Sequence, residues 1–195
     1  MVPPQQIQSI RDQLGLAPET TLLTMIAEFI PRKRHDLVLR AMADCAEPVH
    51  LALVGTGELV PRVMDQASSL GISDRVHFLG WRGDVPSILA ASQATVLFSA
   101  HEGLPRSTME SMSMGKPVIG SDIRGLRDLL SDGCGILVPS GDVAGLTKAM
   151  DTMARDCAMA LKMGSAGRER VKSDYEIGPL LEAQAMDSAN QFVAP

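Results

Sequence analysis

Short apolar runs alternate with longer segments of helical periodicity, and this alternation constrains the fold of the chain more than any other feature. The pattern begins at Thr21 and is typical of successive βα units around a parallel sheet. Strands covered by helices on both faces read as nearly continuous apolar runs. Six such runs are predicted strands: Thr21–Ala27, His50–Val54, Arg75–Leu79, Ala94–Phe98, Pro117–Gly120 and Gly135–Val138. We therefore expect an α/β fold, a doubly wound, Rossmann-like parallel sheet of about six strands with helices on both faces.

The segments between and after these runs carry the helical period. The predicted helices are His35–Cys45, Leu59–Leu70, Val85–Ala91, Pro105–Met114, Val143–Arg155, Met159–Lys172 and Pro179–Gln191. Residues 1–20 are interpreted as a connecting arm with a short helix over Gln5–Leu14, and residues 21–192 as one domain. A second interpretation, in which the first helix simply packs on the sheet, stays open.

Composition excludes several classes of function. The formal charge is −5 and the Lys and Arg residues do not cluster, so the sequence shows no basic patch for nucleic acid or an anionic membrane. Peripheral membrane association is not readable from the composition. Three separated cysteines, Cys45, Cys134 and Cys157, argue against a disulfide framework and a zinc site, and favour a reducing cytoplasm. No apolar run approaches the roughly 20 residues of a membrane span, and the first residues lack a signal peptide. A soluble, cytoplasmic protein is expected.

Polar residues gather after the predicted strands, which is where open parallel sheets bind ligands. The densest stretch runs from Ser99 to Glu110 and joins a strand to a helix through a Gly-Pro loop. Pro105 suits the first helical position, so the amides of Arg106, Ser107 and Thr108 are expected to be unpaired and to attract phosphate. Glu102 and Glu110 can then contact different parts of one extended ligand. The alternative is that both are ordinary surface carboxylates.

Two further segments carry weaker signals. Gly55-Thr56-Gly57 closes a strand and permits close backbone approach by an anion, but the third glycine of a dinucleotide fingerprint is replaced by Val60. Lys33 follows the first strand and can neutralise a departing diphosphate, or it belongs to a solvated basic turn. No motif of a serine hydrolase, zinc protease or P-loop NTPase occurs.

The stretch Glu102-Gly-Leu-Pro-Arg-Ser-Thr-Met-Glu110 and the residues after it resemble the E-x7-E signature of family 4 (group 1) glycosyltransferases, specifically their C-terminal domain, one half of the GT-B fold. Three further segments match in the family's order: Leu53-Val-Gly-Thr-Gly-Glu, Val76-His-Phe-Leu-Gly-Trp and Gly135-Ile-Leu-Val-Pro-Ser-Gly-Asp. The resemblance covers about residues 22–175. It implies transfer of a hexosyl group from a UDP-sugar or GDP-sugar, with retained anomeric configuration and no bound metal or other cofactor.

The resemblance also implies roles for individual residues. Glu102 is expected to face the donor sugar and Lys33 to stabilise the diphosphate; these two are the catalytic candidates. Glu110 is expected to bind the ribose hydroxyls. The other donor-binding candidates are Gly103, Leu104, Pro105 and Arg106 in the signature loop, Gly55 and Gly57, Arg82 near the base, and Arg32.

Two departures from the family pattern shape these expectations. Ala27-Glu28 stands where many members carry Gly-Arg, with the arginine on phosphate, so either Arg32 or Arg34 compensates or the donor is held less tightly. The acceptor-binding N-terminal domain is absent from these residues, so we expect an excised domain, a truncated product or a subunit of a split enzyme. Transfer to a glycan or lipid acceptor is then expected to be negligible for the chain alone.

Two alternative functions remain at this point. One is a non-catalytic subunit that pairs with a separate acceptor-domain protein. The other is a nucleotide-sugar epimerase-like domain of GT-B form.

Overall fold

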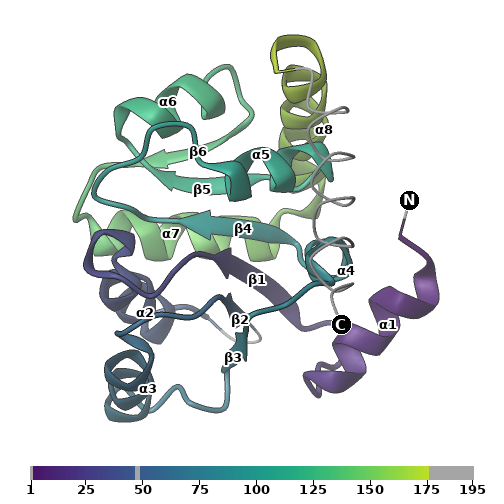
Figure 1. Ribbon diagram of the computed structural model, residues 1–195. Helices are drawn as coiled ribbons and strands as arrows, with labels where there is room; N and C mark the ends of the chain where they lie inside the picture. The colour runs from purple at the N-terminus through teal and green to yellow at the C-terminus, as the bar shows by residue number, and fades with distance from the viewer. Residues whose placement is uncertain (1, 47–48, 176–195) are drawn as a thin grey trace, which may run out of the picture.

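The computed structural model describes residues 2–46 and 49–175, which form one parallel six-stranded sheet (Figure 1). The strand order is β3-β2-β1-β4-β5-β6. The strands are β1 (Thr21–Ile26), β2 (Val49–Val54), β3 (Val76–Gly80), β4 (Ala94–Leu97), β5 (Val118–Ser121) and β6 (Gly135–Val138). The predicted fold class is confirmed, and each predicted strand differs from the observed one by no more than one residue at either end.

Eight α-helices and one 3-10 turn connect and cover these strands within the described residues. They are α1 (Pro4–Gln13), η1 (Pro31–Lys33), α2 (His35–Ala43), α3 (Val60–Ser69), α4 (Val85–Ala91), α5 (Arg106–Ser113), α6 (Arg124–Leu130), α7 (Val143–Arg155) and α8 (Cys157–Asp174). The sequence did not predict η1 or α6. The predicted helix Pro179–Gln191 lies outside the described residues.

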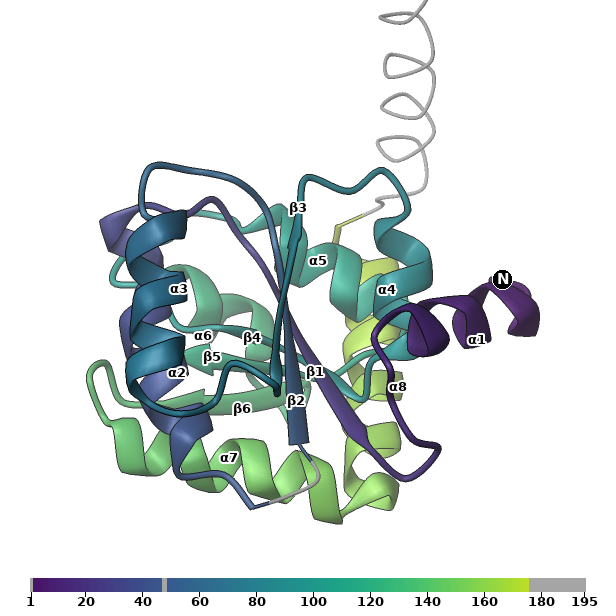
Figure 2. The ribbon, with the colours of Figure 1, turned by 90° about the horizontal axis from the view of Figure 1, so that it is seen from below.

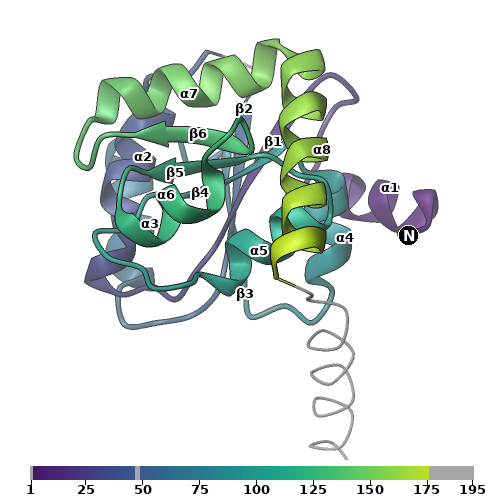
Figure 3. The same cartoon turned by 90° about the horizontal axis from the view of Figure 1, so that it is seen from above.

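The helices form a layer on each side of the sheet. Figure 2 shows α2, α3 and α7 on one side of strands β1 to β3, and α1, α4 and α8 on the other. Helix α5 packs against α8 on this second side, as Figure 3 shows from above. Apolar residues of the strands and of both helix layers, such as Leu23, Leu51 and Met112, are fully buried between them.

Helix α1 lies within residues 1–20, the segment interpreted as a connecting arm. It packs on α4, and its Ile10 joins a buried cluster with Leu22 of β1 and Ile88 of α4. The Arg11 guanidinium donates to the carbonyl oxygens of Ala17 and Thr20, at 2.6 and 2.9 Å. These contacts hold the segment against the domain on the face that carries α4.

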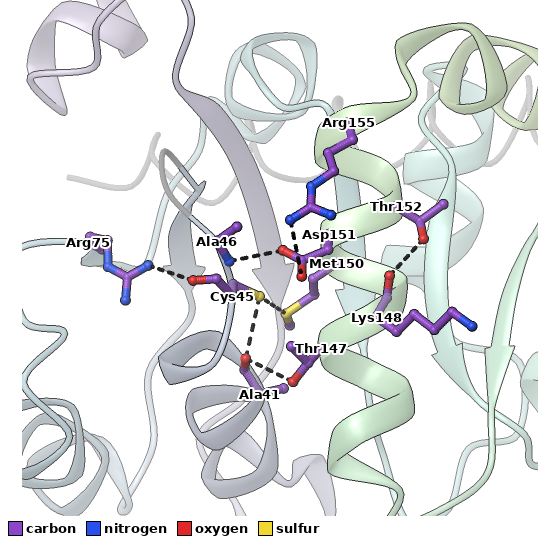
Figure 4. A network of polar contacts seen from close by, with 10 residues as sticks. All are labelled: Ala41, Cys45, Ala46, Arg75, Thr147, Lys148, Met150, Asp151, Thr152 and Arg155. Carbon is purple, nitrogen blue, oxygen red and sulfur yellow. Dashed lines mark hydrogen bonds and ion pairs between the residues drawn. The ribbon is translucent and has the colours of Figure 1, made fainter.

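Helix α7 is anchored on α2 by a small polar network (Figure 4). The Ala46 amide donates to the Asp151 carboxylate at 3.0 Å, and the Thr147 hydroxyl donates to the Ala41 carbonyl at 3.1 Å. The Cys45 thiol lies between the two helices, and its burial raises its pKa to about 12. Cys45 is therefore a neutral packing residue rather than a reactive thiolate.

Candidate functional site

The strand order reverses between β1 and β4, and the candidate site lies at the carboxyl ends of these two strands. Strand β1 pairs with β2 on one side and with β4 on the other, so the loops that follow β1 and β4 become neighbours. Both loops lie at the left of Figure 1. Open α/β sheets bind ligands at such a topological switch point, because the connections leave the two strands in opposite directions and open a crevice.

A buried ion pair joins the two loops. The Lys33 ammonium, from η1 after β1, donates to the Glu102 carboxylate, from the loop after β4, at 2.5 Å. Both residues are buried, at 9% and 8% exposure. The half-exposed Arg32 guanidinium lies 3.6 Å from the second Glu102 oxygen. The structure thus brings together both residues expected to be catalytic, with Arg32 beside them.

The backbone of the Glu102 loop is fixed by contacts from three elements. The Ala100 amide donates to the Arg32 carbonyl at 2.8 Å, and the Ser121 hydroxyl at the end of β5 donates to the Ser99 carbonyl at 2.6 Å. The start of α6 lies so close that a Cβ atom at Gly125 would overlap the carbonyl oxygens of Glu102 and Gly103. Gly125 and Ser121 therefore shape the site although the sequence did not single them out.

Helix α5 begins at Arg106, and Pro105 is its N-cap residue rather than its first helical residue. The expectation that Thr108 has an unpaired amide is wrong, because this amide donates to the Pro105 carbonyl at 3.1 Å. Thr108 is the third residue of the helix, and its amide reaches the carbonyl three residues earlier, in a 3-10 type bond that tightens the first turn. The amides that remain for an anion are those of Arg106 and Ser107. Leu104, before the helix, is exposed at 53%.

Glu110 lies in the second turn of α5 and is half-buried. Burial raises the pKa of its carboxyl group, and the positive charge of Arg106, one turn earlier, acts in the opposite direction. Within residues 2–46 and 49–175, no hydrogen bond or ion pair engages this carboxylate. A half-buried carboxylate without a partner is free to accept hydrogen bonds from a ligand.

The glycines of the Gly55-Thr56-Gly57 segment pack closely on the backbone of the loop after β1. Gly55 and Gly57 have φ values of 141° and 153°, and a Cβ atom at Gly57 would lie 2.6 Å from the Phe29 carbonyl oxygen. A Cβ atom at Gly55 would overlap the Ala27 carbonyl. The Phe29 amide donates to the Thr56 carbonyl at 2.9 Å. Gly55 and Gly57 thus allow β2 to approach the backbone of the loop after β1, the loop that leads to Lys33.

Arg82 is engaged by other protein groups. Its guanidinium donates twice to the Asp84 carboxylate, each time at 2.7 Å, and also to the Gln13 side chain of α1 at 3.3 Å. The carboxylate of Asp84 raises the pKa of Arg82, and the guanidinium lowers the pKa of Asp84. Arg82 nevertheless borders a cleft of about 390 Å³ at the carboxyl ends of β1, β2 and β3, together with Glu28, Thr56 and Trp81.

The two arginines considered as replacements for the usual phosphate-binding arginine differ in availability. Arg34 lies 3.1 Å from the Asp36 carboxylate, with which it forms an ion pair. Arg32 points to the Glu102 loop, where it also donates to the His101 carbonyl at 3.4 Å. Of the two, only Arg32 stands at the Lys33–Glu102 pair. Arg34 is also one of the non-glycine residues with positive φ, at 49°.

In residues 2–46 and 49–175, no group of three or more His, Cys, Asp or Glu side chains is placed to hold a metal ion. In the same part of the chain, no helix has the length and apolar character to cross a membrane.

Comparisons with known proteins bear on the family and the fold of the chain. The family model described as "Glycosyl transferases group 1" matches residues 6–170. The lipopolysaccharide core biosynthesis glycosyltransferase LpsE of Rhizobium meliloti (strain 1021) is 28% identical over 174 residues, which cover 89% of this chain and 51% of LpsE. The N-acetyl-alpha-D-glucosaminyl L-malate synthase of Bacillus anthracis is also 28% identical over 174 residues, 88% of this chain and 46% of the synthase.

A solved structure shares the fold as well. Anabaena Alr3699/HepE in complex with UDP-glucose has a TM-score of 0.86 and 27% sequence identity, over 97% of this chain and 54% of HepE. The expected relation to one half of a GT-B enzyme is thereby confirmed. The chain spans about half the length of the curated relatives it matches.

Proposed function

We propose that this chain, which belongs to the group 1 glycosyltransferases, binds the nucleoside-diphosphate sugar from which a hexosyl group is transferred to a glycan or lipid acceptor. The observation that carries the proposal is the buried Lys33–Glu102 pair at the switch point of the sheet. It places a cation and a carboxylate side by side where α/β sheets bind nucleotides. The bound UDP-glucose of the Anabaena relative supports the class of donor.

The phosphate end of the donor is assigned to the cations beside Glu102. Lys33 and Arg32 supply two positive charges, and the free amides of Arg106 and Ser107 at the start of α5 supply hydrogen-bond donors. When the bond from the sugar to the diphosphate breaks, negative charge grows on the leaving phosphate. Groups already fixed in place stabilise that charge without further reorganisation. These cations neutralise the charge of the diphosphate, and no metal ion is proposed for that role.

The sugar and ribose are assigned to the two carboxylates of the signature. Glu102 shares Lys33 with the incoming phosphate, so donor binding weakens the ion pair and leaves carboxylate oxygens to accept hydrogen bonds from sugar hydroxyls. Glu110, half-buried and without a partner in the described part of the chain, is placed to accept from the ribose hydroxyls. Retention of anomeric configuration is part of the proposal.

Calorimetric titration with UDP, GDP, ADP and NAD tests the proposal. We expect binding of UDP or GDP, weakened at least tenfold by Glu110→Ala because a hydrogen bond to a charged group contributes about 1.5–3 kcal/mol. Glu169→Ala, which removes an exposed carboxylate of α8, is the matched control and should bind like the parent chain. Binding of NAD that is insensitive to Glu110→Ala would instead support a dinucleotide site.

A further inference from the structure

A small cavity lies beneath the first turns of α5, between this helix and β4. Its volume is about 10 Å³, and its lining includes Thr95 of β4, Ile26 at the end of β1, and Ser107, Thr108 and Ser111 of α5. We propose that this cavity binds one water molecule, which is held by the Thr95 and Thr108 hydroxyls and ties the start of α5 to the sheet.

The two threonine hydroxyls are buried polar groups that the protein itself does not satisfy. Thr95 and Thr108 are 4% and 1% exposed. Within residues 2–46 and 49–175, neither hydroxyl has a hydrogen-bond partner, so the two are not bonded to each other. Folded proteins pair nearly all buried polar groups with protein atoms or with ordered water, because an unpaired group lowers stability. Since both hydroxyls line the same cavity, one small molecule can satisfy both.

The volume of the cavity restricts its occupant to a molecule of the size of water. A buried water requires roughly 10–15 Å³ of such space and two to four polar partners, whereas a phosphate or a sugar requires far more. The Ser111 hydroxyl donates to the Ser107 carbonyl at 2.7 Å and keeps lone pairs with which it can accept a further hydrogen bond. The cavity therefore has both the size and the polar groups that one water molecule needs.

Helix α5 buries hydroxyl groups on the side where a helix packed on a sheet normally buries apolar side chains. Its buried residues are Thr108, Ser111 and Met112, and the first two carry hydroxyls. Valine has nearly the shape of threonine and would fill the same space without an unpaired polar group. The presence of hydroxyls on both walls of the cavity therefore favours a bound polar molecule over an apolar contact.

The water site adjoins the part of α5 that is assigned to the phosphate end of the donor. Ser107 lines the cavity, and its amide is one of the two free amides at the start of the helix. A water that bridges Thr108 to Thr95 connects this turn to a strand in the middle of the sheet, which limits the movement of the amides. Thr95 and Thr108 are thus positioning residues, a step that rests on the proposed donor-binding function. The water site itself does not depend on that function.

Valine substitutions test the water site through the sign of their effect on stability. Thr95→Val and Thr108→Val each remove a hydrogen bond to the water, and each is expected to lower the folding equilibrium constant about fivefold to tenfold. If the hydroxyls had no partner, each valine would instead remove an unpaired polar group and raise the constant. The double variant should lose little more than the weaker single variant, because one water serves both hydroxyls. Urea denaturation measures all three.

Thr152→Val is the matched control for this cycle. The Thr152 hydroxyl is exposed and donates to the Lys148 carbonyl of its own helix, so its loss should simply add to that of Thr95→Val. Stabilisation by Thr95→Val or Thr108→Val would overturn the water site, and so would strictly additive losses in their double variant. Nuclear Overhauser contacts between water and the two threonine side chains, present in the parent chain and lost in the double variant, detect the water directly. Their absence from the parent chain would also overturn the proposal.

The affinity for UDP and GDP tests the positioning role separately. At a temperature at which circular dichroism shows every variant folded, we expect Thr95→Val to weaken nucleotide binding about threefold or more, and Thr95→Ser, which keeps the hydroxyl, to bind like the parent chain. Affinity unchanged by Thr95→Val would overturn the positioning role. No binding of either nucleotide by the parent chain would overturn the proposed function and the positioning role together, while the urea measurements still decide the water site.

Discussion

The Lys33 ammonium and the Glu102 carboxylate lie 2.5 Å apart and are buried, although 69 residues separate them in the chain. Their contact depends on the strand order, because β1 and β4 are adjacent in the sheet although β2 and β3 lie between them in the sequence. The pair keeps the two loops together before any ligand arrives. A phosphate that enters the site would therefore meet a lysine whose position is already fixed, which lowers the reorganisation that binding requires.

Glu102→Gln is expected to destabilise the chain more than Lys33→Met. Removing the carboxylate leaves the buried Lys33 without an anionic partner, at an expected cost of about 3 kcal/mol in the free energy of unfolding. Removing the lysine leaves Glu102 within reach of Arg32, at 3.6 Å, so the expected loss is about 1 kcal/mol. Urea denaturation of both variants measures the difference.

The exposed ion pair between Arg34 and Asp36 provides the control for this comparison. Asp36→Asn should change the free energy of unfolding by less than about 1 kcal/mol, because solvent screens the pair. Equal losses for Lys33→Met and Glu102→Gln would show that Arg32 does not substitute for the lysine.

Gly125→Ala is expected to disturb the site through the backbone of the Glu102 loop. The added methyl group would overlap the carbonyl oxygens of Glu102 and Gly103, so either the loop or the start of α6 must move. We expect destabilisation of about 1–3 kcal/mol, as for other overpacked positions, together with a loss of nucleoside-diphosphate binding. Gly167→Ala is the matched control, since its nearest neighbour is 3.4 Å away. Undiminished nucleotide binding by Gly125→Ala would show that the loop position does not matter.

The sequence predicted the strands well because each is a short apolar run bounded by polar residues, a signal that depends only on local burial. It missed α6, which has seven residues and Gly125 at its second position, a residue that weakens any helix prediction. It also placed the start of α5 at Pro105. Proline is acceptable both as the first helical residue and just before it, and only the backbone angles distinguish the two.

The candidate site was predictable in its members but not in their contacts. Position after a strand made Lys33, Glu102 and Glu110 candidates, because the carboxyl ends of parallel strands share one edge, and the resemblance to the family then implied their roles. The ion pair between Arg82 and Asp84, two residues apart, depends on side-chain rotamers. The close approach of Gly55 and Gly57 to the loop after β1 depends on tertiary packing. Neither contact leaves a periodic signal in the sequence.

Arg34→Gly is expected to stabilise the fold. Arg34 joins η1 to α2 with φ 49° and ψ 41°, the left-handed region that side chains disfavour. Glycine adopts this conformation without a steric penalty, and the lost ion pair with Asp36 is exposed, so we expect a gain of roughly 0.5–1 kcal/mol. Thermal denaturation measures it. A lower midpoint than that of the parent chain would mean that the Arg34 side chain contributes more than its backbone costs.

The buried histidine His35 is expected to make the fold sensitive to acid. Its ring stacks on Phe29 at 4.1 Å between centroids, and neither ring nitrogen has a hydrogen-bond partner in the described part of the chain. Burial lowers its pKa to about 4, with Asp36 opposing the shift and Lys33 adding to it. The folded chain thus resists a proton that the unfolded chain accepts near pH 6.5. Neutral His35 contributes about 3 kcal/mol to the free energy of unfolding above about pH 6.5, and this contribution is lost as the pH falls toward 4.

His35→Phe keeps the stacked ring and removes the titration. The free energy of unfolding of this variant, measured in urea from pH 7.5 to 4, should fall less steeply than that of the parent chain. Exposed His101→Phe should follow the parent curve. Parallel curves for His35→Phe and the parent would show that His35 is protonated in the folded state near its ordinary pKa.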